Sequence, residues 1–383
     1  MVHPDGSLSR RSALLAGAGL SAAAAGLLLA GPAAAAVTAA GPDRKGEIRL
    51  TPRQRAGQRV IVSYPSTTVP QGLLEQIAEG TVGGVILFGN NISSLAQITD
   101  AVGQMVDAHR CSPVQAPLLV MTDQEGGEVR RLPGGPVLSE KQIGESADPS
   151  AAAAKAGRVA GKLLRGAGVN VNLAPVLDVF RTPGDFDDQF QRSYSSDPRV
   201  AARCGAAFIT AQQAHRVAAT AKHFPGLGPA TAQQNTDLGP VTLTTSRRDL
   251  HDIDGYPYPP AIEAGVKLVM CSWAIYTHLD PHNPAGQSRR IIQGELRQRL
   301  GFRGVTITDA INAGALSARG TGPQNAVSAA AAGMDLIVEA SRSVANGRAI
   351  VDGLAEALTH GGLDIAEFDE ALARIRALRL SLA

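Results

Sequence analysis

The chain has 383 residues, of which 44% are hydrophobic and 18% are charged, and its formal net charge is +2. This composition can build a substantial hydrophobic core, so it excludes a chain that is disordered throughout. The small net charge and the lack of a basic run in the body of the chain exclude the electrostatic footprint of a nucleic-acid binder. A neutral small molecule or a glycan is therefore the expected partner.

The first forty residues predict an export signal. The sequence SRRS (9–12) precedes a run rich in Ala, Gly and Leu at 13–30, and small residues follow at 33–36. A charged region, an apolar region and an A-x-A-type site are typical of a cleavable signal peptide, and the paired arginines favour the twin-arginine route. A membrane anchor is the alternative, because the apolar run is close to the minimum spanning length. We expect residues 1–40 to be the signal and a short linker, and residues 41–383 to be one secreted or cell-envelope domain, a monomer without stable membrane insertion.

From residue 57 onward, short β-branched runs alternate with Ala-rich segments of helical period. This alternation is typical of repeated βα units around a parallel sheet. The runs that fit strands are 59–63, 84–88, 118–122, 169–176, 217–221, 268–271, 305–308 and 336–338. The segments that we expect to be helical include 94–108, 151–165, 198–214, 290–300 and 343–359. Eight strand-helix units in one domain predict the α/β class, as a single (β/α)8 TIM barrel rather than an open doubly wound sheet.

Polar residues follow the apolar part of strand after strand. In a TIM barrel these positions converge on the carboxyl-terminal rim, where the active sites of this fold are built. The alternative is that polar residues simply begin solvated loops. The rim positions are Asn90, Asn91, Asp123, Asp178, Lys222, His223, Trp273 and Asp309.

Some side chains are expected to support the structure rather than bind a ligand. Asn172 and Asp178 flank the fourth strand and are expected to hold loops by hydrogen bonds. Trp273 is the only tryptophan, and it either stacks on a sugar face or fills the core. The three cysteines include no C-x-x-C pair, so we expect three buried thiols, with one disulfide as the alternative. No metal or organic cofactor is expected, because no cluster has ligand spacing and no phosphate-binding Gly loop follows a strand.

Several segments, in this order, resemble glycoside hydrolase family 3, in particular its single-domain β-N-acetylhexosaminidase branch. They are GGVILFGNNI (83–92), DQEGGEVRRL (123–132), NLAPVLDV (172–179), QRSYSSDP (191–198), KHFPG (222–226) and GVTITDA (304–310). The resemblance runs from about residue 57 to 380. It implies a (β/α)8 barrel that binds and cleaves a glycan.

The residues themselves suit this chemistry. Asp309 closes a strand, where a rigid backbone can aim its carboxylate at an anomeric carbon and form a glycosyl ester. The resemblance implies that Asp309 is the nucleophile, whereas the alternative is an Asp that caps the following helix. Asp123 ends the third strand beside a Glu-Gly-Gly turn and can accept two sugar hydroxyls. The resemblance implies that it binds the sugar together with the donors Arg131, Arg192, Lys222 and His223.

The sequence departs from the family at the proton donor. The family uses the His of an Asp-Ser-His triplet after the KHFPG segment, and here Gln233, Gln234 and Asn235 occupy those places. An amide cannot donate and retrieve a proton near neutral pH. Asp237 is the only titratable residue in this loop, so we expect it to be the acid. Leu227 and Trp273 also replace two histidines that are common in the family.

Three functional hypotheses follow. The first is an exported retaining glycosidase that acts on a β-linked N-acetylhexosamine or a related glycan, such as material from peptidoglycan turnover, with Asp309 as nucleophile and Asp237 as acid. The second is a glycan-binding relative that has lost hydrolysis. The third is an unrelated barrel enzyme, such as a lyase or a transferase, that uses the same rim.

Overall fold

The computed structural model describes residues 50–383, so the predicted signal lies outside the described residues. Eight parallel strands close into a barrel in the order β1-β13-β12-β9-β7-β6-β3-β2. They are β1 (Val60–Val62), β2 (Gly84–Leu87), β3 (Leu119–Thr122), β6 (Val171–Asn172), β7 (Ala218–Phe224), β9 (Leu268–Cys271), β12 (Val305–Ala310) and β13 (Leu336–Val338). Each predicted run overlaps one of these strands, which confirms the TIM barrel.

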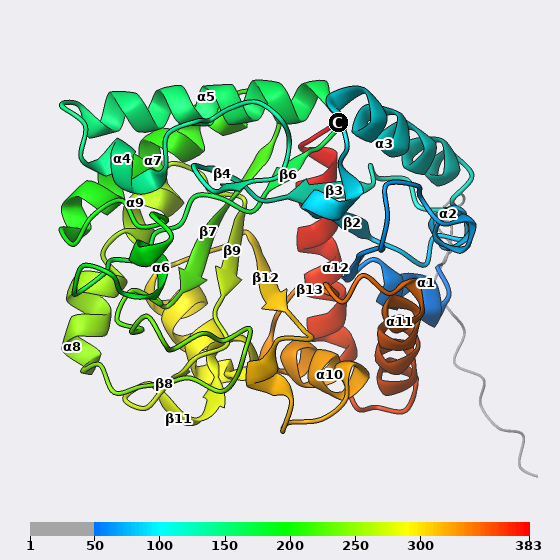
Figure 1. Cartoon of the computed structure of the whole chain (residues 1–383). Coiled ribbons are helices and arrows are strands. Elements are labelled where there is room, and N and C mark those ends of the chain that lie inside the picture. The colour runs from blue at the N-terminus through cyan, green and yellow to red at the C-terminus, as the bar shows by residue number, and fades with distance from the viewer. Residues whose placement is uncertain (1–49) are drawn as a thin grey trace, which may run out of the picture. The chain divides into compact units, whose positions relative to one another are not determined.

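Helices surround the barrel (Figure 1). The longer ones are α2 (Gln71–Ala78), α3 (Leu95–Arg110), α5 (Pro149–Gly166), α7 (Pro198–Gln213), α10 (Gly322–Ala332), α11 (Val344–Thr359) and α12 (Ile365–Leu380). The shorter ones are α1 (Pro52–Gly57), α4 (Glu140–Gly144), α6 (Phe186–Gln189), α8 (Arg247–Asp249) and α9 (Tyr258–Glu263). Four predicted helices are confirmed as α-helices, whereas the segment predicted at 290–300 forms a π-helix, η4 (Arg290–Arg299).

The helix starts follow from the local sequence. Asp148 and Asp197 cap α5 and α7, where each side chain accepts a backbone N–H of the first turn and is followed by a proline. The side chains of Ser94, Thr321 and Ser343 likewise accept a backbone N–H of the first turn of α3, α10 and α11. Such caps satisfy N–H groups that the helix leaves without partners, and proline fits the first helical turn.

The barrel is apolar inside and is closed at its amino-terminal end. Alternate strand residues point inward, and they form one cluster with Ile375, Leu378 and Leu382 at the end of the chain. The buried Arg379 of α12 donates to the carbonyl of Ala116, which lies just before β3. Helix α12 therefore covers the end of the barrel at which the strands begin.

The same alternation delivers side chains to the open end. In β12 the inward residues Val305 and Ile307 are followed by Asp309, and in β3 the inward residues Leu119 and Met121 are followed by Asp123. Because side chains alternate with a period of two, both carboxylates continue the inward rows and face the mouth of the barrel.

Smaller elements follow the strands at this open end of the barrel. A hairpin of β4 (Gln124–Gly126) and β5 (Val129–Arg130) follows β3. A second sheet joins β8 (Thr242–Leu243), β10 (Ile275–Tyr276) and β11 (Asp280–Pro284). Single turns complete the set: η1 (Gly89–Asn91), η2 (Leu250–Asp254), η3 (Ala285–Gln287) and η5 (Gly314–Leu316).

Two further expectations can be compared with the structure. The three cysteines are free, but the prediction that all three are buried is wrong for Cys111, which is exposed because it follows the last turn of α3 at the surface. Cys204 and Cys271 are buried as predicted. Among residues 50–383, no helix has the length and apolar character needed to cross a bilayer.

Candidate active site

A cavity of about 230 Å³ lies at the carboxyl-terminal mouth of the barrel. Its wall combines residues of β2, β7, β9, β12 and β13 with residues of the loops that follow the barrel strands. The structure brings all the predicted site residues together in this wall: Asp123, Arg131, Arg192, Lys222, His223, Asp237 and Asp309. Their roles in binding or catalysis remain predictions.

Asp123 stands between two cations. Lys222 Nζ lies 2.9 Å from Asp123 Oδ1, and Arg131 Nε lies 3.9 Å from Asp123 Oδ2. The β4–β5 hairpin places Arg131 there, because it folds back so that the Arg131 N–H donates to the Asp123 carbonyl. Arg131 Nε is buried and has no hydrogen-bond partner among the described residues. It is therefore a donor that a bound hydroxyl or carbonyl oxygen could satisfy.

Glu125 is a site residue to which the sequence assigned no role. Its side chain is 1% exposed and accepts two hydrogen bonds from Arg192, at 2.9 and 3.0 Å, while Lys222 Nζ lies 2.7 Å away. Burial alone would raise the pKa of Glu125, but the charges of Arg192 and Lys222 lower it to about 2. A signal was available, because Glu125 is two residues from Asp123 and so shares its side of the extended chain.

Arg192 ties this network to the loop after β6. Its Nη1 atom donates to Asp187 Oδ1 at 2.7 Å, while its other edge holds Glu125. Burial opposes its charge, but the two carboxylates raise the pKa of Arg192 well above its usual range. In the same way, Asp123 and Glu125 outweigh the burial of Lys222 and raise its pKa. Both side chains are permanent cations that are fixed beside the cavity.

His223 lies in the wall as a neutral ring. Its Nδ1 atom is 2.7 Å from Asp178 Oδ2, and burial lowers the pKa of His223 to about 4. Because a carboxylate accepts from Nδ1, that nitrogen carries the proton and Nε2 is left as an acceptor. His223 can therefore accept a hydrogen bond from a sugar hydroxyl at Nε2. As a neutral ring it is not suited to donate a proton to a leaving group.

Asp178 holds the loop around His223, as predicted. It accepts backbone hydrogen bonds from His223 and Leu227. Asn172 likewise bonds both backbone groups of Gln124. Burial raises the pKa of Asp178 and that of Asp187 to about 6. Both buried carboxyl groups are therefore less readily ionised than an exposed aspartate.

Among the described residues, one group has the spacing of metal ligands: Asp178, Asp187 and His223. Their ligand atoms lie within 4.8 Å of one another. Their surroundings do not favour a cation. Asp178 already accepts from two backbone N–H groups and from His223, and Arg192 supplies positive charge to Asp187. A metal ion would have to displace these donors.

Asp309 lacks a cationic partner of this kind. It is half-buried, and its Oδ1 atom accepts the N–H of Ala310 at 2.6 Å. Burial and the neighbouring Asp237 raise the pKa of Asp309, and the charge of Lys222 only partly opposes this rise. No side-chain hydrogen bond to its carboxylate occurs among residues 50–383. One carboxylate oxygen is therefore available to a ligand.

Asp237 reaches the same cavity from the loop after β7. Asp237 is exposed as a whole residue, but its carboxyl group is partly shielded from water. This partial burial raises the pKa of Asp237. The amides that replace the family triplet do not line the cavity. Two of them shape the loop instead, because Gln234 accepts the N–H of Thr231 and Asn235 accepts the N–H of Asp237.

Four predicted rim residues lie outside the cavity wall: Asp178, described above, and Asn90, Asn91 and Trp273. Asn90 and Asn91 hold the loop after β1 by hydrogen bonds to the carbonyls of Pro65 and Tyr64. Trp273 is 1% exposed, so the alternative that it fills the core is confirmed. Its ring lies so close to Gly286 that a Cβ there would be 2.4 Å away, and its Nε1 atom donates to the Ala310 carbonyl. Trp273 therefore supports the backbone beside Asp309 without facing a sugar.

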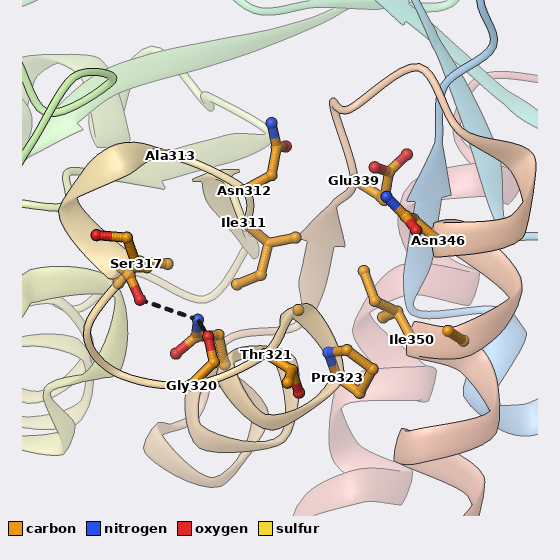
Figure 2. A pocket seen from close by; sticks show the side chains of 14 residues that line it. Ile311, Asn312, Ala313, Ser317, Gly320, Thr321, Pro323, Glu339, Asn346 and Ile350 are labelled. Carbon is orange, nitrogen blue, oxygen red and sulfur yellow. Dashed lines mark hydrogen bonds between the residues drawn. The ribbon is translucent and has the colours of Figure 1, made fainter.

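A larger cavity of about 360 Å³ lies next to this site, between the loops after β12 and β13 and the first turns of α10 and α11 (Figure 2). Its walls are mostly apolar, and its one carboxylate, Glu339, is already bonded to Ser63 and to the Ser341 backbone. Because titratable groups converge on the smaller cavity, we assign the active site there.

Comparison with known proteins agrees with the fold. The family model of the glycosyl hydrolase family 3 N terminal domain matches residues 54–378. A protein of Arthroderma benhamiae, described as an uncharacterized secreted glycosyl hydrolase, is 45% identical over 332 residues, or 86% of this chain and 93% of that protein. A β-hexosaminidase of Stenotrophomonas maltophilia is 34% identical over 286 residues, or 73% of this chain and 82% of the relative.

A solved structure supports the same relationship. A glycoside hydrolase family 3 β-N-acetylglucosaminidase from Paenibacillus sp. str. FPU-7 has a TM-score of 0.81 at 31% identity, and the match covers 87% of this chain but 63% of that one. A closed barrel with a polar mouth and this set of relatives defines a glycosidase, an enzyme that hydrolyses O-glycosyl bonds. The chain belongs to glycoside hydrolase family 3.

Proposed function

We propose that the protein is an exported retaining glycosidase that acts on a β-linked N-acetylhexosamine or a closely related glycan. One observation carries this proposal: Asp309 and Asp237, two carboxyl groups without a cationic partner among residues 50–383, line the same cavity as a ring of fixed polar and charged groups. A retaining mechanism needs two carboxyl-type groups about 5 to 5.5 Å apart, one to attack and one to transfer protons.

In the first step Asp237 gives its proton to the glycosidic oxygen while Asp309 attacks the anomeric carbon. The bond between that carbon and the oxygen breaks, an ester bond to Asp309 forms, and the leaving alcohol departs. In the second step the Asp237 carboxylate removes a proton from water, and the resulting hydroxide displaces Asp309. The raised pKa of Asp237 suits the first role, because it keeps more of this group protonated at mildly acidic pH.

The remaining groups hold the sugar. Asp123 accepts hydrogen bonds from sugar hydroxyls, and His223 accepts one at Nε2. Lys222 and Arg131 donate hydrogen bonds to hydroxyl or carbonyl oxygens. Arg192 and Glu125 fix these groups in place. The names of the β-hexosaminidase relatives support an N-acetylhexosamine substrate, and the secreted relative supports export. The paired arginines of the predicted signal favour the twin-arginine route. Peptidoglycan fragments are a substrate that an exported protein would meet.

The test uses purified mature protein with the 4-nitrophenyl β-glycosides of GlcNAc, glucose and xylose. We expect turnover of the GlcNAc substrate, and NMR should first detect the β-anomer of the released sugar. The Asp309→Asn variant should still bind the sugar but not release nitrophenol. Binding without turnover by the unaltered protein would overturn the proposal and favour a glycan-binding relative, which the missing family triplet would then explain.

A further inference from the structure

We propose that Gly314 is a positioning residue that sets where Asp237 stands relative to Asp309, an inference that rests on the proposed acid role of Asp237. Gly314 N donates to the Asp237 carbonyl at 2.9 Å, and Ala315 N donates to the Thr236 carbonyl at 2.9 Å. Both donors belong to η5, which follows directly after the strand that carries Asp309. The backbone on each side of Asp237 is therefore tied to the strand end that carries the other carboxyl group.

The absence of a side chain at 314 permits this contact. A Cβ added at Gly314 would lie 2.4 Å from the carbonyl carbon of Leu238, 2.5 Å from its oxygen and 2.8 Å from the Asp237 oxygen. These distances are far inside van der Waals contact, and all three atoms belong to the main chain. No rotamer change can relieve such an overlap, so one of the two backbones must move.

The loop is the side that would move. Leu238 is 83% exposed, so little holds the loop from outside. Leu316 of η5 is 1% exposed, its carbonyl accepts from Asn325, and Ile311 just before η5 donates to the Val338 carbonyl of β13. Ala313 and Ser317 flank η5 at the edge of the larger cavity (Figure 2). A side chain at 314 would therefore push Asp237 outward and leave Asp309 in place.

This displacement has a specific kinetic signature. Proton donation matters most when the leaving group is a poor one, such as phenol, and matters least for 2,4-dinitrophenol, which departs as a stable anion. A misplaced acid therefore slows the phenyl β-glycoside of GlcNAc much more than the 2,4-dinitrophenyl one. A general loss of structure or of the nucleophile slows both.

The experiment compares kcat/KM for these two substrates in Gly314→Ala and in the control Gly322→Ala. A Cβ at Gly322 would meet nothing closer than Ile350 at 3.9 Å, and this residue starts α10. We expect Gly314→Ala to lose on the order of 10²-fold on the phenyl substrate and less than about 3-fold on the other. The control should match the unaltered enzyme on both. Equal losses on the two substrates, or no loss, would overturn the proposal.

Two additions separate this proposal from the acid role itself. Asp237→Ala should show a larger leaving-group dependence, and azide should restore turnover in Asp237→Ala and in Gly314→Ala by attacking the glycosyl ester. If Asp237→Ala shows no leaving-group dependence, the acid role fails. If Asp237→Ala shows it and Gly314→Ala does not, only the positioning role fails.

A second variant keeps the test decisive if Gly314→Ala does not fold. Ala315→Pro removes the donor to the Thr236 carbonyl without adding a Cβ opposite Leu238. We expect the same selective loss on the phenyl substrate with a smaller magnitude. Thermal unfolding of each variant confirms that the protein compared is folded.

Discussion

The carboxyl groups of the cavity lie in two opposite electrostatic environments. Glu125 is buried against Arg192 and Lys222, which lower its pKa to about 2 despite its burial. Among residues 50–383, Asp309 and Asp237 have no such partners, and burial raises the pKa of both. Glu125 is therefore ionised at mildly acidic and neutral pH, whereas Asp309 and Asp237 take up a proton more readily than an exposed aspartate.

This difference separates a carboxylate that shapes the binding site from carboxyl groups that can react with the substrate. A carboxylate that is locked by two cations can orient them and so shape a binding site, but it is a weak nucleophile and a poor acid. A carboxyl group that keeps a free oxygen and a raised pKa can attack a carbon or release a proton. The contrast predicts opposite effects of neutralising one carboxylate from each group.

The largest effect is expected at Asp309. Replacing it with Asn leaves the cavity shape unchanged but removes the attacking oxygen, so kcat for an aryl β-GlcNAc substrate should fall at least about 10³-fold. Stability should move the other way. The raised pKa means that ionising Asp309 costs folding free energy as pH rises above 3.8, and Asn has no such cost. Melting curves should therefore show the variant gaining more Tm relative to the unaltered protein at pH 7 than at pH 4.

Glu125→Gln tests the other half of the comparison. The change removes the negative charge that pairs with the buried Arg192 and Lys222. One of their positive charges is then left uncompensated, so the free energy of unfolding should fall by about 3–5 kcal/mol. The lowered pKa of Glu125 places its own stabilising contribution above pH 4.5, and this contribution is lost as pH falls toward 2. Urea unfolding at pH 7 measures the loss. Unchanged stability would mean that the paired and unpaired groups do not differ as described.

The barrel was predictable because strand alternation and the position of polar residues at strand ends are local patterns. The inward row of β12 leads from Val305 and Ile307 to Asp309, and the sequence alone shows that order. The same alternation places Glu125 on the side of Asp123, but it does not show the partner of Glu125. That partner is Arg192, 67 residues away, and only the closed fold brings the two together.

Other residues show where local patterns are ambiguous. Trp273 suited both a sugar platform and the core, and only its contact with Gly286 decides between them. Cys111 was predicted to be buried because cysteine usually is, but its place after the last turn of α3 exposes it. Asp187 lies in an acidic loop segment that resembles a solvated turn, and its burial against Arg192 follows from tertiary packing.

Asp237 sharpens the comparison through pH. Because the acid must be protonated, kcat/KM for a phenyl β-GlcNAc substrate should fall as pH rises through the pKa of Asp237, which burial raises above 3.8. Asp237→Ala should lower kcat/KM by about 10²-fold at the optimum and flatten the alkaline side of the profile. An alkaline limb that survives in this variant would point to a different proton donor.

The smallest expected effect distinguishes the two arginines of the cavity. Arg192 is held by Glu125 and Asp187, whereas Arg131 lies 3.9 Å from Asp123 and keeps a buried Nε without a partner. Arg131→Gln should therefore leave the unfolding midpoint nearly unchanged but raise KM about 10-fold, the cost of one charge-assisted hydrogen bond to the sugar. Substrate titration and thermal unfolding of the same preparation measure both. If the variant instead loses Tm while KM is unchanged, Arg131 belongs with the locked cations and not with the groups that meet the substrate.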